Sequence, residues 1–272
     1  MKTRHLRRYA CIGTLIAVGS LAGCSSSDGA ADAAESTRSE APSSPAQESA
    51  SPTASAAPAF ATPAECDGLQ LKGGETLAGP ALSKCLVAAL KAYGSGTESV
   101  LSGEESGTSK FVFGDEPALA GSMTGPEGEK AYVFKGDSEW IKTPGLGKWV
   151  KGDAGSTDPQ EQLVAATGKL YRVLADPAVT AQMIATAPEW TVEAERPVIS
   201  LENGEDVKAW RIVNKKPYTY LGAAVREHIL WFGDDFTPYG GQAESQTGGV
   251  MATTTQHFYD LGEPVTIEPP QE

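Results

Sequence analysis

The chain has 272 residues, with 22 basic and 35 acidic side chains, so its formal net charge is −13. Proteins that bind nucleic acids neutralise phosphates with clustered Lys and Arg, and this chain has no such cluster after its first residues. The charge therefore excludes nucleic-acid binding. It also excludes attachment to anionic lipid headgroups through surface charge, because the two would repel.

Residues 1–23 have the pattern of an export signal peptide. Its four basic residues are Lys2, Arg4, Arg7 and Arg8. They precede a mostly apolar stretch over 9–21, which is shorter than the ~20 apolar residues that span a bilayer. Without the signal, 18 basic and 35 acidic residues remain, so the mature chain would have a net charge of −17.

The segment L-A-G-C at 21–24 resembles the lipobox of bacterial lipoproteins. The resemblance implies that the Cys24 thiol receives a diacylglyceryl group and that cleavage makes Cys24 the new N-terminus. An ordinary secretory signal followed by a chance cysteine is the alternative. Because two or more acyl chains hold a protein on a bilayer stably, we expect a lipid-anchored protein on the extracytoplasmic face of the cell membrane.

Residues 24–65 are predicted to be a disordered tether on this anchor. After Cys24 they are almost entirely Ser, Ala, Pro, Glu, Gln, Thr and Gly, with Phe60 as the single aromatic residue. Such a composition cannot bury enough apolar surface to offset the entropy of the chain. The remaining residues, 66–272, have the size of one domain.

Two cysteines remain in this domain, Cys66 and Cys85. In an oxidising compartment, an even pair of cysteines favours a disulfide bond. A shared metal ion is the weaker alternative, because two thiolates without nearby histidines do not complete a tetrahedral site.

The order of predicted elements favours an α+β fold with a large antiparallel sheet. A helix is expected over 80–93, because Pro80 suits a first turn and Gly94 a helix end. Two further helices are expected over 159–174 and 177–187, the second capped by Asp176. Short strands between turn residues are expected at 110–113, 118–123, 130–134, 139–142, 148–151, 189–193, 207–213, 226–232, 240–245 and 250–261.

This layout resembles the actinobacterial lipoprotein family of LppX, LprA, LprF and LprG, which is distantly similar to the lipoprotein carriers LolA and LolB. The segments that carry the resemblance are A-G-S-M-T at 120–124, A-Y-V-F-K-G-D at 131–137, W-I-K-T-P-G-L-G-K-W-V-K at 140–151, D-P-Q-E-Q-L at 158–163 and Y-D-L-G-E-P-V-T-I at 259–267. The resemblance implies a strongly curved antiparallel half-barrel whose concave face is covered by helices. In some members the space between sheet and helices holds the acyl chains of lipids or glycolipids.

A cavity of this kind would be lined by apolar side chains of the strands and covering helices. Its candidate lining residues are Phe111, Phe113, Tyr132, Phe134, Leu170, Met183, Trp210, Ile212, Leu230, Phe232 and Phe258. The alternative is that these side chains form an ordinary filled core.

Motifs for catalysis are missing from the sequence. It has no nucleophile elbow, no H-E-x-x-H and no phosphate-binding loop, and only His228 and His257 follow the signal. We therefore expect no enzyme, no cofactor and no metal site. The first hypothesis is a non-enzymatic carrier or binder of a lipid or other hydrophobic ligand at the cell envelope. The second is an interaction or sensory module with a filled core and a protein partner that the sequence does not identify.

Overall fold

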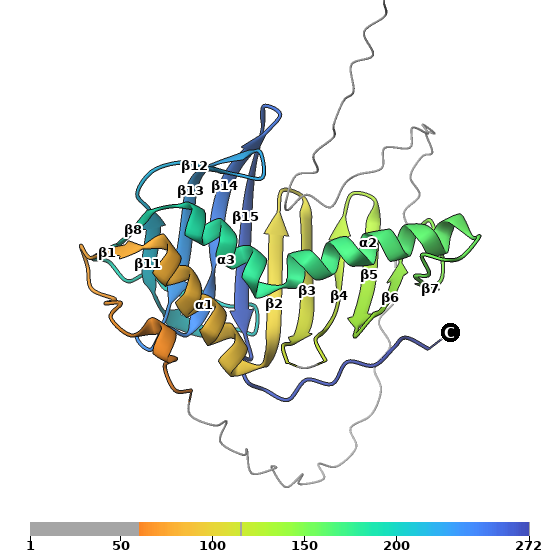
Figure 1. The fold of residues 1–272 in the computed structure, drawn as a ribbon, viewed down its shortest axis with the longest axis horizontal. Helices are drawn as coiled ribbons and strands as arrows, with labels where there is room; N and C mark the ends of the chain where they lie inside the picture. Colours follow the sequence, from red (N-terminus) through yellow and green to blue (C-terminus); the bar gives the residue numbers. More distant parts are fainter. Residues whose placement is uncertain (1–59, 115, 272) are drawn as a thin grey trace, which may run out of the picture.

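The structure, a computed structural model, describes residues 60–114 and 116–271. The expected signal, the lipid site Cys24 and most of the expected tether lie outside these residues. The described residues form an open antiparallel sheet of 13 strands with three α-helices across its concave face (Figure 1). The expected fold class, an α+β half-barrel covered by helices, is confirmed.

The element bounds show how the chain alternates between the two layers. The helices are η1 (Ala64–Cys66), α1 (Gly79–Tyr93), α2 (Pro159–Ala175) and α3 (Pro177–Thr186). The strands of the large sheet are β1 (Thr76–Ala78), β2 (Ser95–Ser102), β3 (Glu105–Val112), β4 (Ala118–Gly125), β5 (Gly128–Lys135), β6 (Ser138–Lys142), β7 (Val150–Lys151), β8 (Glu189–Val192), β11 (Trp210–Asn214), β12 (Tyr218–Tyr220), β13 (Ala223–Phe232), β14 (Pro238–Thr247) and β15 (Val250–Tyr259). A separate hairpin consists of β9 (Val198–Ser200) and β10 (Asp206–Lys208).

The strand order in the large sheet is β1-β8-β11-β13-β14-β15-β2-β3-β4-β5-β6-β7, and β12 pairs with β13. The run β2 to β7 is a simple meander. The last strand of the chain, β15, pairs with β2, so that Phe258 lies opposite Glu98. This β15–β2 junction joins the two halves of the sheet.

Each α-helix begins and ends where local sequence signals place it. Asp158 and Asp176 accept hydrogen bonds of 2.8 Å from the backbone N–H groups of Gln160 and Ala178, which caps α2 and α3. Gly94 ends α1 in the left-handed conformation, with φ of 75°. The three helices predicted from the sequence are confirmed to within one residue at each end.

Several strands were missed or misplaced by the sequence prediction. β2 was not expected, because its sequence S-G-T-E-S-V-L-S is polar and contains few residues that favour strands. The strand expected over 207–213 is two strands, β10 and β11, which belong to different sheets. Ala209 lies between them and is fully buried, so the chain changes layers there.

The main core lies between the concave face and the helices. Paired residues on neighbouring strands place their side chains on the same face of the sheet. In the half that contains β8, β11 and β13, the buried side chains on the concave face include Trp190, Val192, Ile212 and Leu230. α1 and α3 pack on this half and contribute Leu82 and Ile184, both with no exposed surface.

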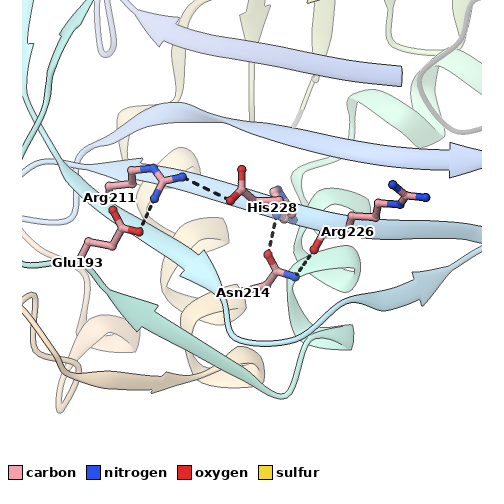
Figure 2. Close-up of polar contacts among 6 residues, drawn as sticks. Glu193, Arg211, Asn214, Arg226 and His228 are labelled. Atoms are coloured by element: carbon pink, nitrogen blue, oxygen red, sulfur yellow. Dashed lines mark hydrogen bonds and ion pairs between the residues drawn. The ribbon is translucent and has the colours of Figure 1, made fainter. Parts of the chain in front are cut away.

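The convex face is partly covered by the β9–β10 hairpin, which packs Ile199 against Ile229 and Trp231 of β13. Beside this patch, the guanidinium of Arg211 forms an ion pair with Glu193 (Figure 2). It forms a second ion pair with Glu227, which lies on the same convex face of β13 as Ile229. Both faces of β13 are therefore buried, which explains why its sequence is apolar on both sides.

The N-terminal end of the described chain is tied to α1. Cys66 and Cys85 form the expected disulfide bond, at a sequence separation of 19, and both are buried. Closing a loop of this length with a disulfide bond stabilises the folded state by about 3 kcal/mol, because it lowers the entropy of the unfolded chain. Phe60, which the composition assigned to the tether, stacks on Tyr93 with ring centroids 4.1 Å apart. The packed chain therefore begins before Cys66.

Candidate ligand cavity

A cavity of about 300 Å³ lies between the concave face and the helices, where α2 meets α3. Its floor consists of β2 to β5, and the last turn of α1 and the first turn of α3 border it. The residues that line it are Lys91, Glu98, Phe111, Val112, Phe113, Gly114, Pro117, Ala118, Leu119, Phe134, Gly136, Asp176 and Pro177.

The apolar wall of the cavity is a cross-strand row. Leu119 of β4 lies opposite both Phe111 of β3 and Phe134 of β5, so all three side chains point to the concave face. Phe113 follows two residues after Phe111, and the two rings stack with centroids 4.6 Å apart. Gly96 lies opposite Phe111, where a Cβ atom would be 2.8 Å from the ring. The aromatic wall therefore depends on glycine at position 96.

One carboxyl group lies inside this apolar site. Glu98 of β2 points to the concave face, and its Oε2 accepts a hydrogen bond of 2.8 Å from Nε2 of Gln256. Burial raises the pKa of the Glu98 carboxyl to about 7, and the hydrogen bond from Gln256 opposes this shift. No cation among residues 60–114 and 116–271 is recorded within ion-pair distance of Glu98.

One further polar pair lies on the concave face beside Glu98, formed by Ser109 and Tyr132. The hydroxyl groups of Ser109 and Tyr132 are 2.5 Å apart, across the intervening strand β4. Gly121 of β4 lies between them, where a Cβ atom would be 2.6 Å from the Ser109 hydroxyl. The two hydroxyl groups form a hydrogen bond with each other and do not line the cavity. Glu98 is therefore the acidic side chain that the strands contribute to the cavity lining.

The structure divides the residues expected to line a cavity into three groups and leaves one, Leu170, without a described side chain. Phe111, Phe113 and Phe134 line it. Those buried in the core on the same face, outside the lining of this cavity, are Tyr132, Ile212, Leu230, Phe232 and Phe258. Trp210 and Met183 are half-buried, and the indole N–H of Trp210 donates to Asp234 at 2.8 Å. The side chain of Leu170 lies outside the described part of α2.

The most informative lining residues were missed by the sequence prediction. Lys91, Glu98 and Asp176 were not candidates, because the search was for apolar side chains. The spacing of Phe111 and Phe113 identified the wall, but Glu98 belongs to the strand that was not predicted.

A second buried polar group, His228 of β13, lies on the concave face beneath α3. Its backbone N–H donates to Oδ1 of Asn214 at 2.6 Å (Figure 2), and its Nδ1 is 2.7 Å from the Tyr218 hydroxyl. Burial lowers the pKa of His228 to about 4, so the ring is neutral at physiological pH. With its ring against Trp190, His228 is a satisfied core residue.

In the described ranges, no group of three or more His, Cys, Asp or Glu side chains is arranged to hold a metal ion. None of the helices described is both long enough and apolar enough to cross a membrane.

The fold and the cavity together define an α+β half-barrel with an apolar space beneath its helices. Among solved structures, the chain is similar to LprF from Mycobacterium bovis, with a TM-score of 0.45 and 11% identity over 71% of this chain and 97% of that chain. It is also similar to the LolA superfamily protein NE2245 from Nitrosomonas europaea, with a TM-score of 0.24 and 10% identity over 68% of this chain and 92% of that chain. No protein-family model and no curated protein matches the sequence.

Proposed function

We propose that this protein is a non-enzymatic binder or carrier of a hydrophobic ligand at the cell envelope. Acyl chains on Cys24 hold it on the extracytoplasmic face of the membrane, and residues 24–59 separate that anchor from the folded domain. The observation that supports this function best is the cavity of about 300 Å³ walled by Phe111, Phe113, Leu119 and Phe134.

The size and lining of the cavity favour a small amphiphile or a single aliphatic chain. Ligand sites in proteins occupy roughly 300–1,000 Å³ and are mostly apolar with a few placed polar groups. An empty apolar space also destabilises a fold, by roughly 24 cal/mol for each Å³ in core-truncation variants. A bound apolar chain would recover part of that free energy.

The first test is extraction of the folded domain from its native host, followed by mass spectrometry of the extracted lipids. The second is titration of the delipidated domain with a fluorescent fatty alcohol. Leu119→Trp places an indole ring into the cavity and should weaken binding at least about tenfold, because the volume for the chain is lost. Ala131→Trp adds the same ring on the opposite face of β5 and should bind as the wild type does.

Equal binding by Leu119→Trp and the wild type would place the ligand elsewhere. A domain that carries no lipid and binds no alcohol would refute the carrier function and favour the second hypothesis, an interaction module.

A further inference from the structure

We propose that Glu98 selects the polar end of the ligand, which is a hydrogen-bond donor without negative charge: the hydroxyl of an alcohol or the ammonium of an amine. This inference rests on the proposed function, because it assigns the ligand class of the same cavity. Fatty acids and lipid phosphates, whose polar ends are anionic, are then the ligands that the site rejects.

The Glu98 carboxyl group is a hydrogen-bond acceptor in the wall of the cavity, where it can contact the polar end of a bound aliphatic chain. Glu98 lies on the concave face next to Phe111, and Gln256 donates to its Oε2 from the neighbouring strand. That donor orients the carboxyl group and leaves its second oxygen for a ligand, since Gln256 is its one recorded hydrogen-bond partner in the described residues. A donor on the ligand would fill this remaining position.

The electrostatics of the site oppose an anionic head. A buried carboxylate without a cation is costly, and a second negative charge at hydrogen-bond distance would add direct repulsion. Burial of the carboxyl group raises the pKa of Glu98 to about 7, so ionisation of this group is already unfavourable before a second negative charge arrives. A hydroxyl group adds a hydrogen bond to either protonation state, and an ammonium group compensates the ionised state.

Two other charged groups line the cavity. Lys91 lies in the last turn of α1, and Asp176 is the N-cap of α3, where its Oδ1 accepts from the Ala178 N–H. The cavity lining thus contains two acidic side chains, Glu98 and Asp176, and one basic side chain, Lys91. This excess of negative charge opposes the binding of an anionic ligand. An anionic ligand that did enter would pair with Lys91.

The experiment compares three probes of equal chain length, decanol, decylamine and decanoate, by calorimetric titration of the delipidated protein at pH 8. We expect decanol and decylamine to bind the wild type at least about tenfold more tightly than decanoate. Glu98→Gln keeps the shape and removes the charge, so the difference should shrink about tenfold, mainly through tighter binding of decanoate. Glu129→Gln, on the other face of β5, removes an exposed carboxyl group and should leave the wild-type ratio unchanged.

A pH series separates the two kinds of donor. Decylamine should bind the wild type more weakly at pH 6 than at pH 8, because the ammonium needs the ionised carboxylate, whereas decanol should not lose affinity. In Glu98→Gln the affinity for decylamine should be flat over the same range.

Wild-type protein that binds decanoate as tightly as decanol, or a Glu98→Gln variant with the wild-type ratio, would overturn this assignment while leaving the carrier function standing. Binding of none of the three probes would overturn both.

Discussion

Gly79, the first residue of α1, packs directly on Ala187, which follows α3: a Cβ atom at position 79 would lie 1.8 Å from the Ala187 carbonyl oxygen. The backbone N–H of Gly79 also donates to the carbonyl of Pro188 at 3.0 Å. The two helices over this half of the sheet therefore meet backbone to backbone.

Gly79→Ala should destabilise the domain by about 2–3 kcal/mol, because backbone atoms must move to accept the methyl group. Urea unfolding followed by circular dichroism measures the change. Gly145→Ala is the matched control, since its Cβ would meet nothing closer than 3.9 Å. Equal stability of the two variants would show that α1 and α3 adjust freely.

Glu98 should make the unliganded domain less stable at high pH. Its pKa is raised from 4.5 to about 7, so the unfolded chain loses this proton at lower pH than the folded chain does. Stability is therefore lost as the pH rises from about 4.5 to 7. Glu98→Gln should equal the wild type near pH 4 and exceed it by up to about 3 kcal/mol at pH 8. A constant difference between the two proteins across this range would contradict the raised pKa.

His228 should act in the opposite direction, at low pH. Its pKa is lowered from 6.5 to about 4, so below pH 6.5 the unfolded chain takes up a proton that the folded chain excludes. This contribution to stability is lost as the pH falls from 6.5 to 4, by up to about 3 kcal/mol.

The effects of His228 and Glu98 overlap between pH 4.5 and 6.5 and partly cancel in the wild type. The measurement is therefore the difference between His228→Gln and the wild type in chemical unfolding at each pH. This difference should shrink as the pH falls, and parallel curves would refute the account.

Cys24→Ser should abolish the lipid anchor. Without acyl chains the acidic chain has no electrostatic attraction to an anionic membrane, so we expect it in the soluble fraction. Fractionation of cells and metabolic labelling with a fatty acid measure this. Cys11→Ser is the control: it replaces a cysteine within the expected signal peptide and should leave membrane retention unchanged. Unchanged membrane retention and processing of Cys24→Ser would remove the basis for the proposed location.

The sequence predicted those parts of the fold that have strong local signals. Pro159 with Asp158, and Pro177 with Asp176, mark the starts of α2 and α3 unambiguously. The aromatic residues Phe111 and Phe134 marked strands with one apolar face. These signals depend on residues adjacent in the chain, so no tertiary information was needed.

The polar part of the cavity could not be predicted in this way. β2 has a weak strand signal because its own sequence is polar. Pairing with β3 and, at long range, with β15 holds it in the sheet. Five of the eleven candidates proved to be core residues outside the cavity lining. Two of them, Phe232 and Ile212, are covered because α1 and α3 pack on their half of the sheet. Which half a helix covers depends on connections that periodicity does not reveal.

The β15–β2 junction has a consequence for the order of assembly. Glu98, which lines the cavity, accepts its hydrogen bond from Gln256, 158 positions away in the chain. Before β15 docks, β2 is an unprotected edge strand that other chains can pair with. Contacts of such long range also slow folding. A nascent or partly exported chain therefore contains every residue that lines the cavity before it contains Gln256, so Glu98 acquires its orienting hydrogen bond only when the final strand pairs with β2.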